Sequence, residues 1–314
     1  MNDLNELSGA SQSGTLTLAG STTEPGSDVS SVAVNGQTAT EYADGTFAAS
    51  GFTPSYGQNT YTATATDLHG RQSSSSVTVN VRGGAGYAYD QNGNMTSDGY
   101  RNFAYDDENE LIGVWVSGAW SNSFAYDGKM RRRIERDYTW AAGTSGWQET
   151  NEVHFIYDGN VVVEERNAAN VPMVSYTRGN DLSGTLQGAG GIGGLLARTT
   201  FGQELPGAPT TAFYHADGNG NVTVMIYPDQ QLAAKYLYNP FGNMLAMSGP
   251  LRNFNKYRFS SKEWEGNAGL YYYGYRFYDP NLQRCVNRDP LWEQGFEFPR
   301  QRVADQLTCL GSDL

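Results

Sequence analysis

The chain has 314 residues, which is long enough for about two domains. Its 33 Asp and Glu residues outnumber its 21 Lys and Arg residues, and the net charge of −12 repels phosphate backbones, so nucleic acid is not an expected partner. The chain also contains 38 Gly and 21 Tyr residues, but only 17% of its residues are charged. Aromatic side chains fit the surfaces of sheets and Gly fits turns, so this composition predicts an all-β protein.

Cysteine and targeting signals are sparse. The only two cysteines, Cys285 and Cys309, are too far apart for a compact zinc knuckle, and the sequence leaves open whether they form a disulfide or remain thiols. No apolar run reaches the length of a membrane span, and residues 1–7 lack the basic and apolar regions of a signal peptide. Taken alone the chain would stay in the cytoplasm, whereas its composition is typical of extracellular proteins; a truncated chain would reconcile the two.

Residues 14–82 predict a small β-sandwich. Polar and apolar residues alternate in Thr15–Leu18, in Val32–Val34 and in Asn59–Asp67, as they do in strands with one buried face. The dipeptide Asn35-Gly36 is typical of a two-residue hairpin, because both positions accept a positive φ. Short strands at this spacing resemble a bacterial Ig-like module, without the Cys and Trp core residues of antibody domains.

Beyond a Gly-rich joint at residues 82–86 the chain becomes repetitive, and such repetition is typical of architectures built from stacked units. The clearest unit is Tyr89-Asp90-Gln91-Asn92-Gly93-Asn94-Met95-Thr96. Related units follow at Tyr105-Asp106, Tyr126-Asp127, Tyr157-Asp158 and Tyr278-Asp279-Pro280, with degenerate forms at Ala216–Thr223 and at Tyr238–Asn243.

Each unit predicts a β-hairpin. The Tyr ends a strand and packs its ring on the sheet, and the Asp carboxylate accepts a backbone N–H two residues later in an Asx-turn. Gly93 supplies a positive φ, and Asn94 leads into the returning strand. Because one such hairpin cannot bury its own aromatic face, the units are expected to stack into a curved sheet. Most of the tyrosines are therefore interpreted as packing residues.

These units resemble the YD repeats of Rhs proteins and of teneurin-like shells. The ordered run formed by Lys256–Glu263, Gly269–Pro280 and Asn287–Pro290 is similar to the Rhs repeat-associated core, and the whole resemblance covers roughly residues 84 to 295. The expected domains are a remnant of an earlier repeat at 1–13, an Ig-like β-sandwich at 14–82, a YD-repeat region at 83–250 that forms a partial curved shell, an Rhs core at 251–295 and a divergent tail at 296–314.

The resemblance implies a scaffold. In this family, repeated hairpins spiral into a hollow shell that encloses a variable C-terminal cargo, often a toxin, and the core region closes one end. The full-length proteins are secreted or attached to the cell surface. The implied partners are other YD repeats or a C-terminal cargo, with cell-surface glycans or proteins as further candidates. No cofactor and no metal is implied.

Shell-forming relatives release their cargo by an aspartyl-type self-cleavage in the core, and the Arg-Asp pair of that core falls on Arg288 and Asp289. The family motif expected downstream, which would supply a second carboxylate, is absent, so Asp289 is interpreted as a turn residue before Pro290. Sliding the codons of Gly295–Phe298 by one base can give Gly-Leu-Asn-Phe, which is close to the family continuation. We therefore expect the tail from about Phe296 to be frameshifted or degenerate.

Other motifs receive structural interpretations. Gly188–Gly193 fits the GxGxxG spelling but has no predicted strand–helix context, so a Gly-rich bend is expected. Asp217–Asn221 lacks the later Glu of a calcium loop and is assigned to a turn. The cluster Arg131–Arg133 predicts an exposed strand with cross-strand ion pairs, its neighbouring side chains pointing to opposite faces. No catalytic role is predicted for the three dispersed histidines, His69, His154 and His215.

The sequence thus predicts a non-catalytic structural or interaction fragment of an Rhs/YD-repeat surface or secreted protein, and not an enzyme. Two alternatives stay open. One is a carbohydrate- or cell-surface-binding module, since exposed aromatic rings on β-surfaces suit sugar faces. The other is a self-cleaving core that acts through Asp289.

Overall fold

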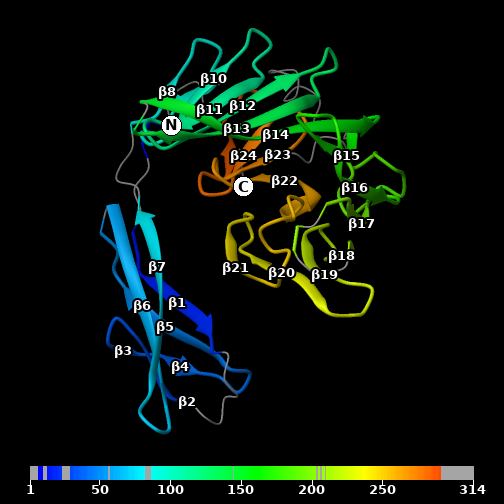
Figure 1. Cartoon of the computed structure of the whole chain (residues 1–314). Coiled ribbons are helices and arrows are strands. Elements are labelled where there is room, and N and C mark those ends of the chain that lie inside the picture. Colours follow the sequence, from blue (N-terminus) through cyan, green and yellow to red (C-terminus); the bar gives the residue numbers. More distant parts are fainter. Residues whose placement is uncertain are drawn as a thin grey trace. The chain divides into compact units, whose positions relative to one another are not determined.

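The computed structural model describes residues 6–9, 13–22, 29–55, 57–81, 86–143, 145–202, 204–205, 207–208 and 210–290. The chain divides into two compact units, Met1–Tyr87 (unit 1) and Ala88–Leu314 (unit 2). Within the described ranges nearly every regular element is an antiparallel strand, and the sole helical element is the 3-10 turn η1, Phe259–Ser261 (Figure 1). The prediction of an all-β protein is confirmed.

Several expectations concern residues outside this description. The repeat remnant at 1–13 lies largely outside it, and so does the joint at 82–86. Cys309 and the tail from Phe296 lie wholly outside it. None of the described residues forms a helix that could span a lipid bilayer.

Unit 1 consists of two sheets that share one apolar core, with strand orders β1-β5-β4 and β3-β2-β6-β7. The alternation predicted for its strands is visible in β5, where Phe47 and Ala49 are buried. Asn35 and Gly36 connect β2 to β3 with φ values of 48° and 81°, as a two-residue hairpin requires. The strands are β1 Leu16–Ser21, β2 Val29–Val34, β3 Gln37–Thr38, β4 Thr40–Glu41, β5 Thr46–Phe52, β6 Gly57–Asp67 and β7 Gln72–Val81.

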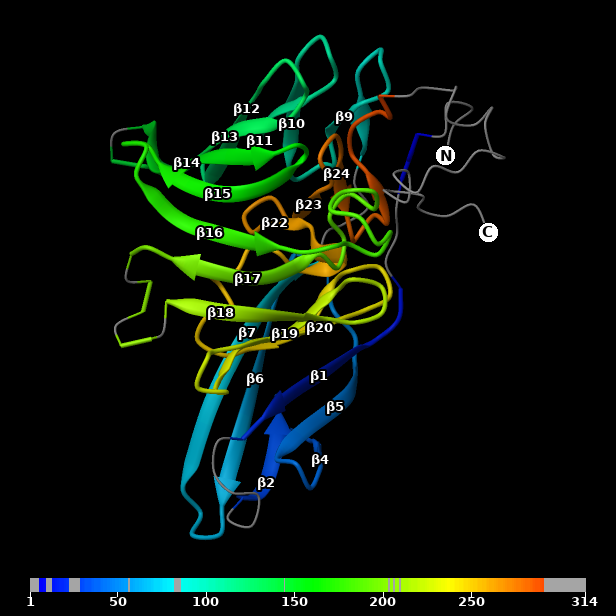
Figure 2. The same ribbon diagram turned by 90° about the vertical axis from the view of Figure 1, so that its right-hand side faces the viewer.

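Unit 2 is built on one 14-stranded antiparallel sheet, here called the wall, in which every strand from β8 to β21 pairs with the next strand along the chain. Figures 1 and 2 show the wall bending round the hairpins that follow it in sequence. Its strands are β8 Ala88–Tyr89, β9 Met95–Ser97, β10 Asn102–Tyr105, β11 Leu111–Val116, β12 Trp120–Tyr126, β13 Arg132–Ala141, β14 Gly146–Asp158, β15 Val161–Asn167, β16 Pro172–Arg178, β17 Leu195–Thr200, β18 Thr211–Ala216, β19 Val222–Ile226, β20 Leu232–Tyr238 and β21 Met244–Ser248.

Residues 251–290, here called the inner region, form η1 and a second small sheet of order β22-β23-β24-β25. Its strands are β22 Glu263–Glu265, β23 Leu270–Tyr272, β24 Phe277–Asp279 and β25 Arg284–Cys285. Apolar residues of β14 to β20 pack together with Leu251 and Tyr257 of the inner region in one buried cluster. The inner region therefore covers the concave face of the wall.

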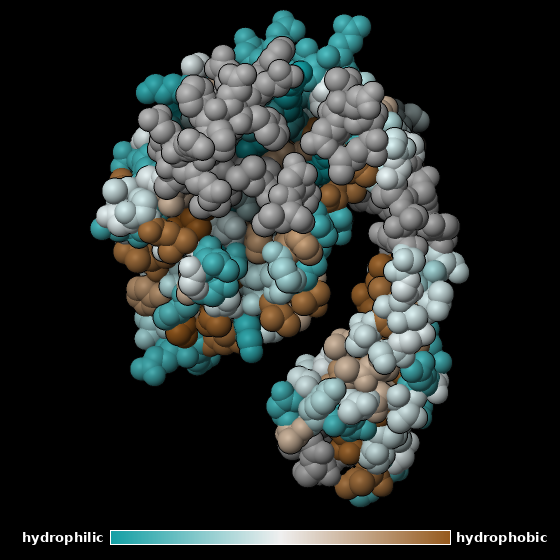
Figure 3. Space-filling model, turned by 180° about the vertical axis from the view of Figure 1, so that it is seen from behind, coloured by the Kyte–Doolittle hydropathy of each residue, from teal (hydrophilic) through white to brown (hydrophobic). Residues whose placement is uncertain are grey.

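The opposite face of the wall exposes large apolar side chains as well as polar ones. Phe213 is 45% exposed, Leu237 56% and Leu245 61%. Figure 3 shows several hydrophobic patches on the face of unit 2 seen there. Leu245 belongs to β21, the strand that ends the sheet.

Candidate functional site

The repeated Tyr-Asp units share one turn geometry. At the clearest unit, Oδ1 of Asp90 accepts hydrogen bonds from the backbone N–H groups of Asn92 and Asn94, both at 2.9 Å. Oδ2 of the same carboxylate accepts the side-chain amide of Asn94 at 2.9 Å. Gly93 has a φ of 85°, which glycine adopts without steric cost. The carboxylate thus closes the turn through three hydrogen bonds.

The same turn recurs along the chain. In each case a side-chain oxygen accepts the backbone N–H groups two and four residues later, and this holds at Asp67, Asp106, Asp127, Asn167, Asp217 and Asn239. The Tyr-Asp spelling did not reveal Asp67 and Asn167, because no Tyr precedes them. Conversely, Asp158 follows Tyr157 but pairs with Val161 across a two-residue turn.

The tyrosine of a unit ties its hairpin to the preceding turn. Its hydroxyl donates to the carbonyl oxygen of the fifth residue after the preceding Asp, and this acceptor residue is fully buried. A β-bulge lies at each of these tyrosines. The pairs, at 2.7 to 2.9 Å, are Tyr105 with Met95, Tyr126 with Leu111, Tyr157 with Arg132 and Tyr238 with Val222.

Burial raises the pKa of all four hydroxyls, so they stay protonated and keep their role as donors. The sequence predicted ring packing for these residues but not the hydroxyl contact. The repeated use of Tyr rather than Phe was the available signal.

Buried ion pairs anchor the inner region on the wall. Arg101, the residue before β10, is 1% exposed and contacts the carboxylates of Asp98 and Asp279. It also donates to the carbonyl oxygen of Ala268. Asp279 is fully buried, and its Oδ1 accepts the N–H of Asn281 at 2.7 Å. The last Tyr-Asp unit is therefore an attachment point between two segments 178 residues apart.

Arg132 corrects the prediction of an exposed arginine cluster. The alternation of side chains holds, since Arg131 and Arg133 are 18% and 39% exposed while Arg132 between them is 0% exposed. The Arg132 guanidinium contacts the carboxylates of Glu263 and Glu265 on β22. It also lies over several aromatic rings of the wall and the inner region. The middle arginine is buried because carboxylates more than 130 residues later meet it inside the wall.

Two cations and three carboxylates form this buried cluster. Lys256 joins it through a contact of 2.8 Å between its Nζ and Oε2 of Glu135. Burial raises the pKa of Glu265, whereas the charges of Lys256 and Arg132 outweigh burial and hold the pKa of Glu135 well below its usual range. We therefore assign a proton to Glu265 and a negative charge to Glu135.

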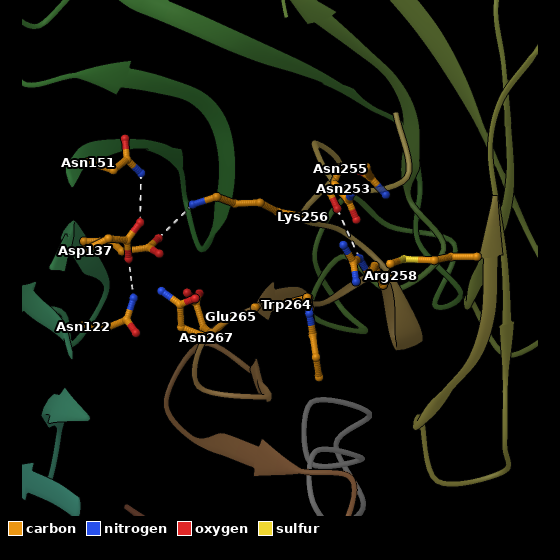
Figure 4. A pocket seen from close by; sticks show the side chains of 13 residues that line it. Asn122, Asp137, Asn151, Asn253, Asn255, Lys256, Arg258, Trp264, Glu265 and Asn267 are labelled. Carbon is orange, nitrogen blue, oxygen red and sulfur yellow. Dashed lines mark hydrogen bonds and ion pairs between the residues drawn. The ribbon is translucent and has the colours of Figure 1, made fainter. Parts of the chain in front are cut away.

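A cavity of about 330 Å³ opens beside the cluster (Figure 4). Asp137 accepts hydrogen bonds from the side-chain amides of Asn122 and Asn151 at its edge. Burial and the charge of Glu135 raise the pKa of Asp137. Oδ1 of Asn122 is buried and has no hydrogen-bond partner among the described residues. The lining also includes Asn253, Asn255, Lys256, Arg258, Trp264, Glu265 and Asn267.

This cavity has two chemical capabilities. A carboxyl with a raised pKa beside one with a lowered pKa is the arrangement that general acid–base catalysis uses. The amide and carboxylate oxygens also suit a ligand rich in hydrogen-bond donors. The described residues contain no group of three or more His, Cys, Asp or Glu placed to hold a metal ion. The sequence did not reveal the cavity, because its residues are spread from 122 to 267 without a recurring spacing.

Arg288 and Asp289 lie apart from the cavity, at the end of the described chain. Oδ2 of Asp289 contacts Nη1 of Arg276 at 2.6 Å, and the Asp289 side chain is 38% exposed. The backbone N–H of Arg288 donates to Oδ1 of Asn94 at 2.8 Å, and its Nη1 donates to the carbonyl oxygen of Asn92 at 2.6 Å. These contacts join the end of the inner region to the first repeat of the wall.

The remaining motifs lie in turns and loops. Gly188–Gly193 lies in the connection between β16 and β17, which contains no helix among the described residues. The carboxylate of Asp217 accepts the N–H groups of Asn219 and Asn221, so its oxygens already serve the turn. His154 contacts Glu152 at 2.7 Å, two residues away on the same strand.

The chain is similar to parts of much longer proteins that are named as nucleases or toxins. It is 30% identical over 210 residues to the tRNA3(Ser)-specific nuclease WapA of Bacillus spizizenii, an alignment that covers 65% of this chain and 8% of that protein. It is 26% identical over 221 residues to the double-stranded DNA deaminase toxin A of Burkholderia cenocepacia, covering 67% of this chain and 15% of that protein. The chain thus spans a small fraction of the length of these curated relatives.

Two further comparisons are with a solved structure and with protein-family models. The crystal structure of TcdB2-TccC3 matches 74% of this chain and 12% of its own chain at 15% identity, with a TM-score of 0.48. No protein-family model matches the chain.

The comparisons correct one prediction and support another in part. The expectation that the chain is not an enzyme is contradicted, because the relatives are named as nucleases and as a deaminase toxin. The coarser expectation of a toxin-related protein is supported in part by the same names.

Proposed function

We propose that this chain is a wall segment of an Rhs/YD-repeat shell within a larger toxin protein that is delivered outside the cell, with a bacterial Ig-like module in residues 14–82. One observation carries the proposal: the 14 strands of the wall follow one another in chain order and bend round an inner region that is held by buried ion pairs. The curated relatives, of which this chain spans 8% to 15%, support the toxin context.

The ends of the wall favour a longer polypeptide. A strand that ends a sheet presents unpaired backbone N–H and C=O groups, which attract another strand. β21 ends the sheet and exposes Leu245 and Met247 beside its backbone edge. Other YD repeats are the expected partners of such an edge, and a toxin segment of the same polypeptide is the expected cargo of the concave side.

Protection of the cargo tests this function. In the longest polypeptide that contains this sequence, we expect limited proteolysis to spare the segment that follows the inner region. The double variant Arg101→Met and Arg132→Met releases the inner region from the wall, so that segment should be cleaved at least tenfold faster. Equal cleavage rates in the wild-type protein and in the variant, both shown to be folded by circular dichroism, would contradict the proposal.

A second candidate function is carbohydrate binding at the cavity of Figure 4. Side-chain amides and carboxylates line this cavity together with a half-buried tryptophan, Trp264, and sugar-binding sites use this combination for hydrogen bonding and ring stacking. A glycan array with the wild-type chain and with Asp137→Ala tests it. Asp229→Ala, in an exposed turn outside the cavity, serves as the matched control. Binding that Asp137→Ala and Asp229→Ala leave equally strong would exclude the cavity as the sugar site.

A further inference from the structure

A second cavity, of about 220 Å³, lies between the wall and the inner region. Cationic side chains reach it from three segments of the chain: Arg131 just before β13, Arg178 at the end of β16 and Lys262 just after η1. The glycine-rich loop 188–193 forms one side of it, and tyrosines, among them Tyr257, Tyr272 and Tyr273, form much of the rest.

Lys262 is the most buried of the three cations. Lys262 is 8% exposed, and its Nζ donates one hydrogen bond, to the carbonyl oxygen of Gly190 at 2.8 Å. Within the part of the chain that the structure describes, it forms no ion pair with a carboxylate. Burial and the positive charge of Arg178 lower the pKa of Lys262 to about 8. An ammonium group has three donors, so two of them remain for a ligand.

Two of the three cations around the cavity form no ion pair with a carboxylate of the described residues. Arg131 forms an ion pair with Asp127 at 2.7 Å. The carboxylate of Glu263 pairs with Arg132 and accepts a hydrogen bond from the hydroxyl of Tyr257. Arg178 donates from Nε to the carbonyl oxygen of Val162 at 2.7 Å, and no carboxylate among the described residues pairs with it. Arg178 and Lys262 therefore form no direct ion pair with a described carboxylate. The nearby carboxylate of Asp181, which raises the pKa of Lys262, is itself occupied by the N–H groups of Ala189 and Gly191.

The glycine-rich loop lies unusually close to these two cations. A Cβ atom at Gly190 would lie 3.1 Å from Nζ of Lys262. A Cβ atom at Gly191 would lie 2.8 Å from Cγ1 of Val161 and 3.4 Å from Nη1 of Arg178. Both glycines also have positive φ, which side-chain-bearing residues rarely adopt. Glycine is thus required here for the loop to close over the cations.

We propose that this cavity binds a small oxyanion, a phosphate or carboxylate group, between Lys262 and Arg178. The oxyanion accepts hydrogen bonds from both side chains and forms the direct ion pairs that no described carboxylate forms with them. The tyrosine rings that line the cavity keep water away from the anion and so strengthen these contacts. The proposed shell function neither requires nor explains this site.

Calorimetric titration with sodium phosphate and, separately, with sodium acetate tests the site at constant ionic strength set with chloride. We expect the wild-type chain to bind at least one of these anions, and binding to both would identify the carboxylate as an accepted group. Lys262→Met and Arg178→Gln should each weaken binding at least tenfold, whereas Lys235→Met, the same substitution at an exposed lysine on β20, should leave it unchanged.

Two results would overturn the inference. One is a wild-type chain that binds neither anion more strongly than it binds chloride. The other is binding that Arg178→Gln leaves intact, and this variant decides the matter if Lys262→Met does not fold, because Arg178 is only half-buried.

Discussion

Unit 1 and unit 2 are both antiparallel β-structures, yet they bury different chemistry. The core of unit 1 consists of apolar or aromatic residues such as Val32, Val34 and Phe47. In unit 2 the largest side chains with less than 2% exposure include Arg101 and Arg132. A sandwich covers its own apolar face, whereas a wall must recruit a later segment of the chain. Apolar contact alone would leave the register of that segment loosely defined, and paired charges fix it.

Removing a buried cation should have the largest effect on the stability of unit 2. Arg132→Met leaves three carboxylates with one fewer cation, and we expect the free energy of unfolding of unit 2 to fall by roughly 3–5 kcal/mol. Tryptophan fluorescence during urea denaturation measures unit 2 selectively, because every tryptophan of the chain lies after residue 87. Arg133→Met, on the outer face, is the control and should cost at most about 1 kcal/mol. Equal losses would show that the buried cluster has no special weight.

The buried carboxyl group of Glu265 on β22 should make the stability of unit 2 depend on pH. The unfolded chain releases the proton of Glu265 near its ordinary pKa, while burial keeps that proton on the folded protein to higher pH. Between these two values the folded state binds more protons, so the free energy of unfolding decreases as pH rises. Glu265→Gln removes this dependence, which amounts to at most about 1.4 kcal/mol per pH unit.

Glu263→Gln is the matched variant for this test. It removes a carboxylate that contacts Arg132 while keeping the shape of the side chain. We expect a loss of roughly 3 kcal/mol at neutral pH, with the pH dependence of Glu265 still present. Urea denaturation at several pH values between about 5 and 7 distinguishes the two variants, and identical profiles would contradict the assignment of the proton to Glu265.

Local features of the chain were predictable from the sequence, and distant ones were not. The turn at Asp90 is encoded in five consecutive residues, because the three hydrogen bonds of the Asp90 carboxylate span at most four positions. The burial of Arg132 depends on Glu263 and Glu265, which lie 131 and 133 positions later. Nothing in the spacing of Arg131–Arg133 distinguishes an arginine that meets solvent from one that meets the inner region. The cavity of Figure 4 was missed for the same reason.

The hydroxyl contacts between successive repeats allow a smaller test. Tyr126→Phe keeps the ring but removes the donor to the carbonyl oxygen of Leu111, and the loss of one buried hydrogen bond is expected to cost about 1 kcal/mol. Tyr275→Phe is the control, since Tyr275 is 45% exposed. If both variants unfold at the same urea concentration, the rings alone hold the repeats together.

The smallest expected effect concerns the turns, where the repeats of unit 2 differ among themselves. Asn239 accepts the backbone N–H groups two and four residues later with its amide oxygen. Asp217 accepts the equivalent N–H groups of its own turn with a carboxylate oxygen. The two backbone contacts therefore need an oxygen and not a charge, but Asp217→Asn also loses the oxygen that accepts the side-chain amide of Asn221 at 2.8 Å, so it should lower the free energy of unfolding by about 0.5 kcal/mol. Asp217→Ala removes the acceptor altogether and should cost about 1 kcal/mol, comparable to the loss of a helix cap. A larger loss for Asp217→Asn than for Asp217→Ala, measured by the same urea denaturation, would mean that the negative charge is itself part of the repeat.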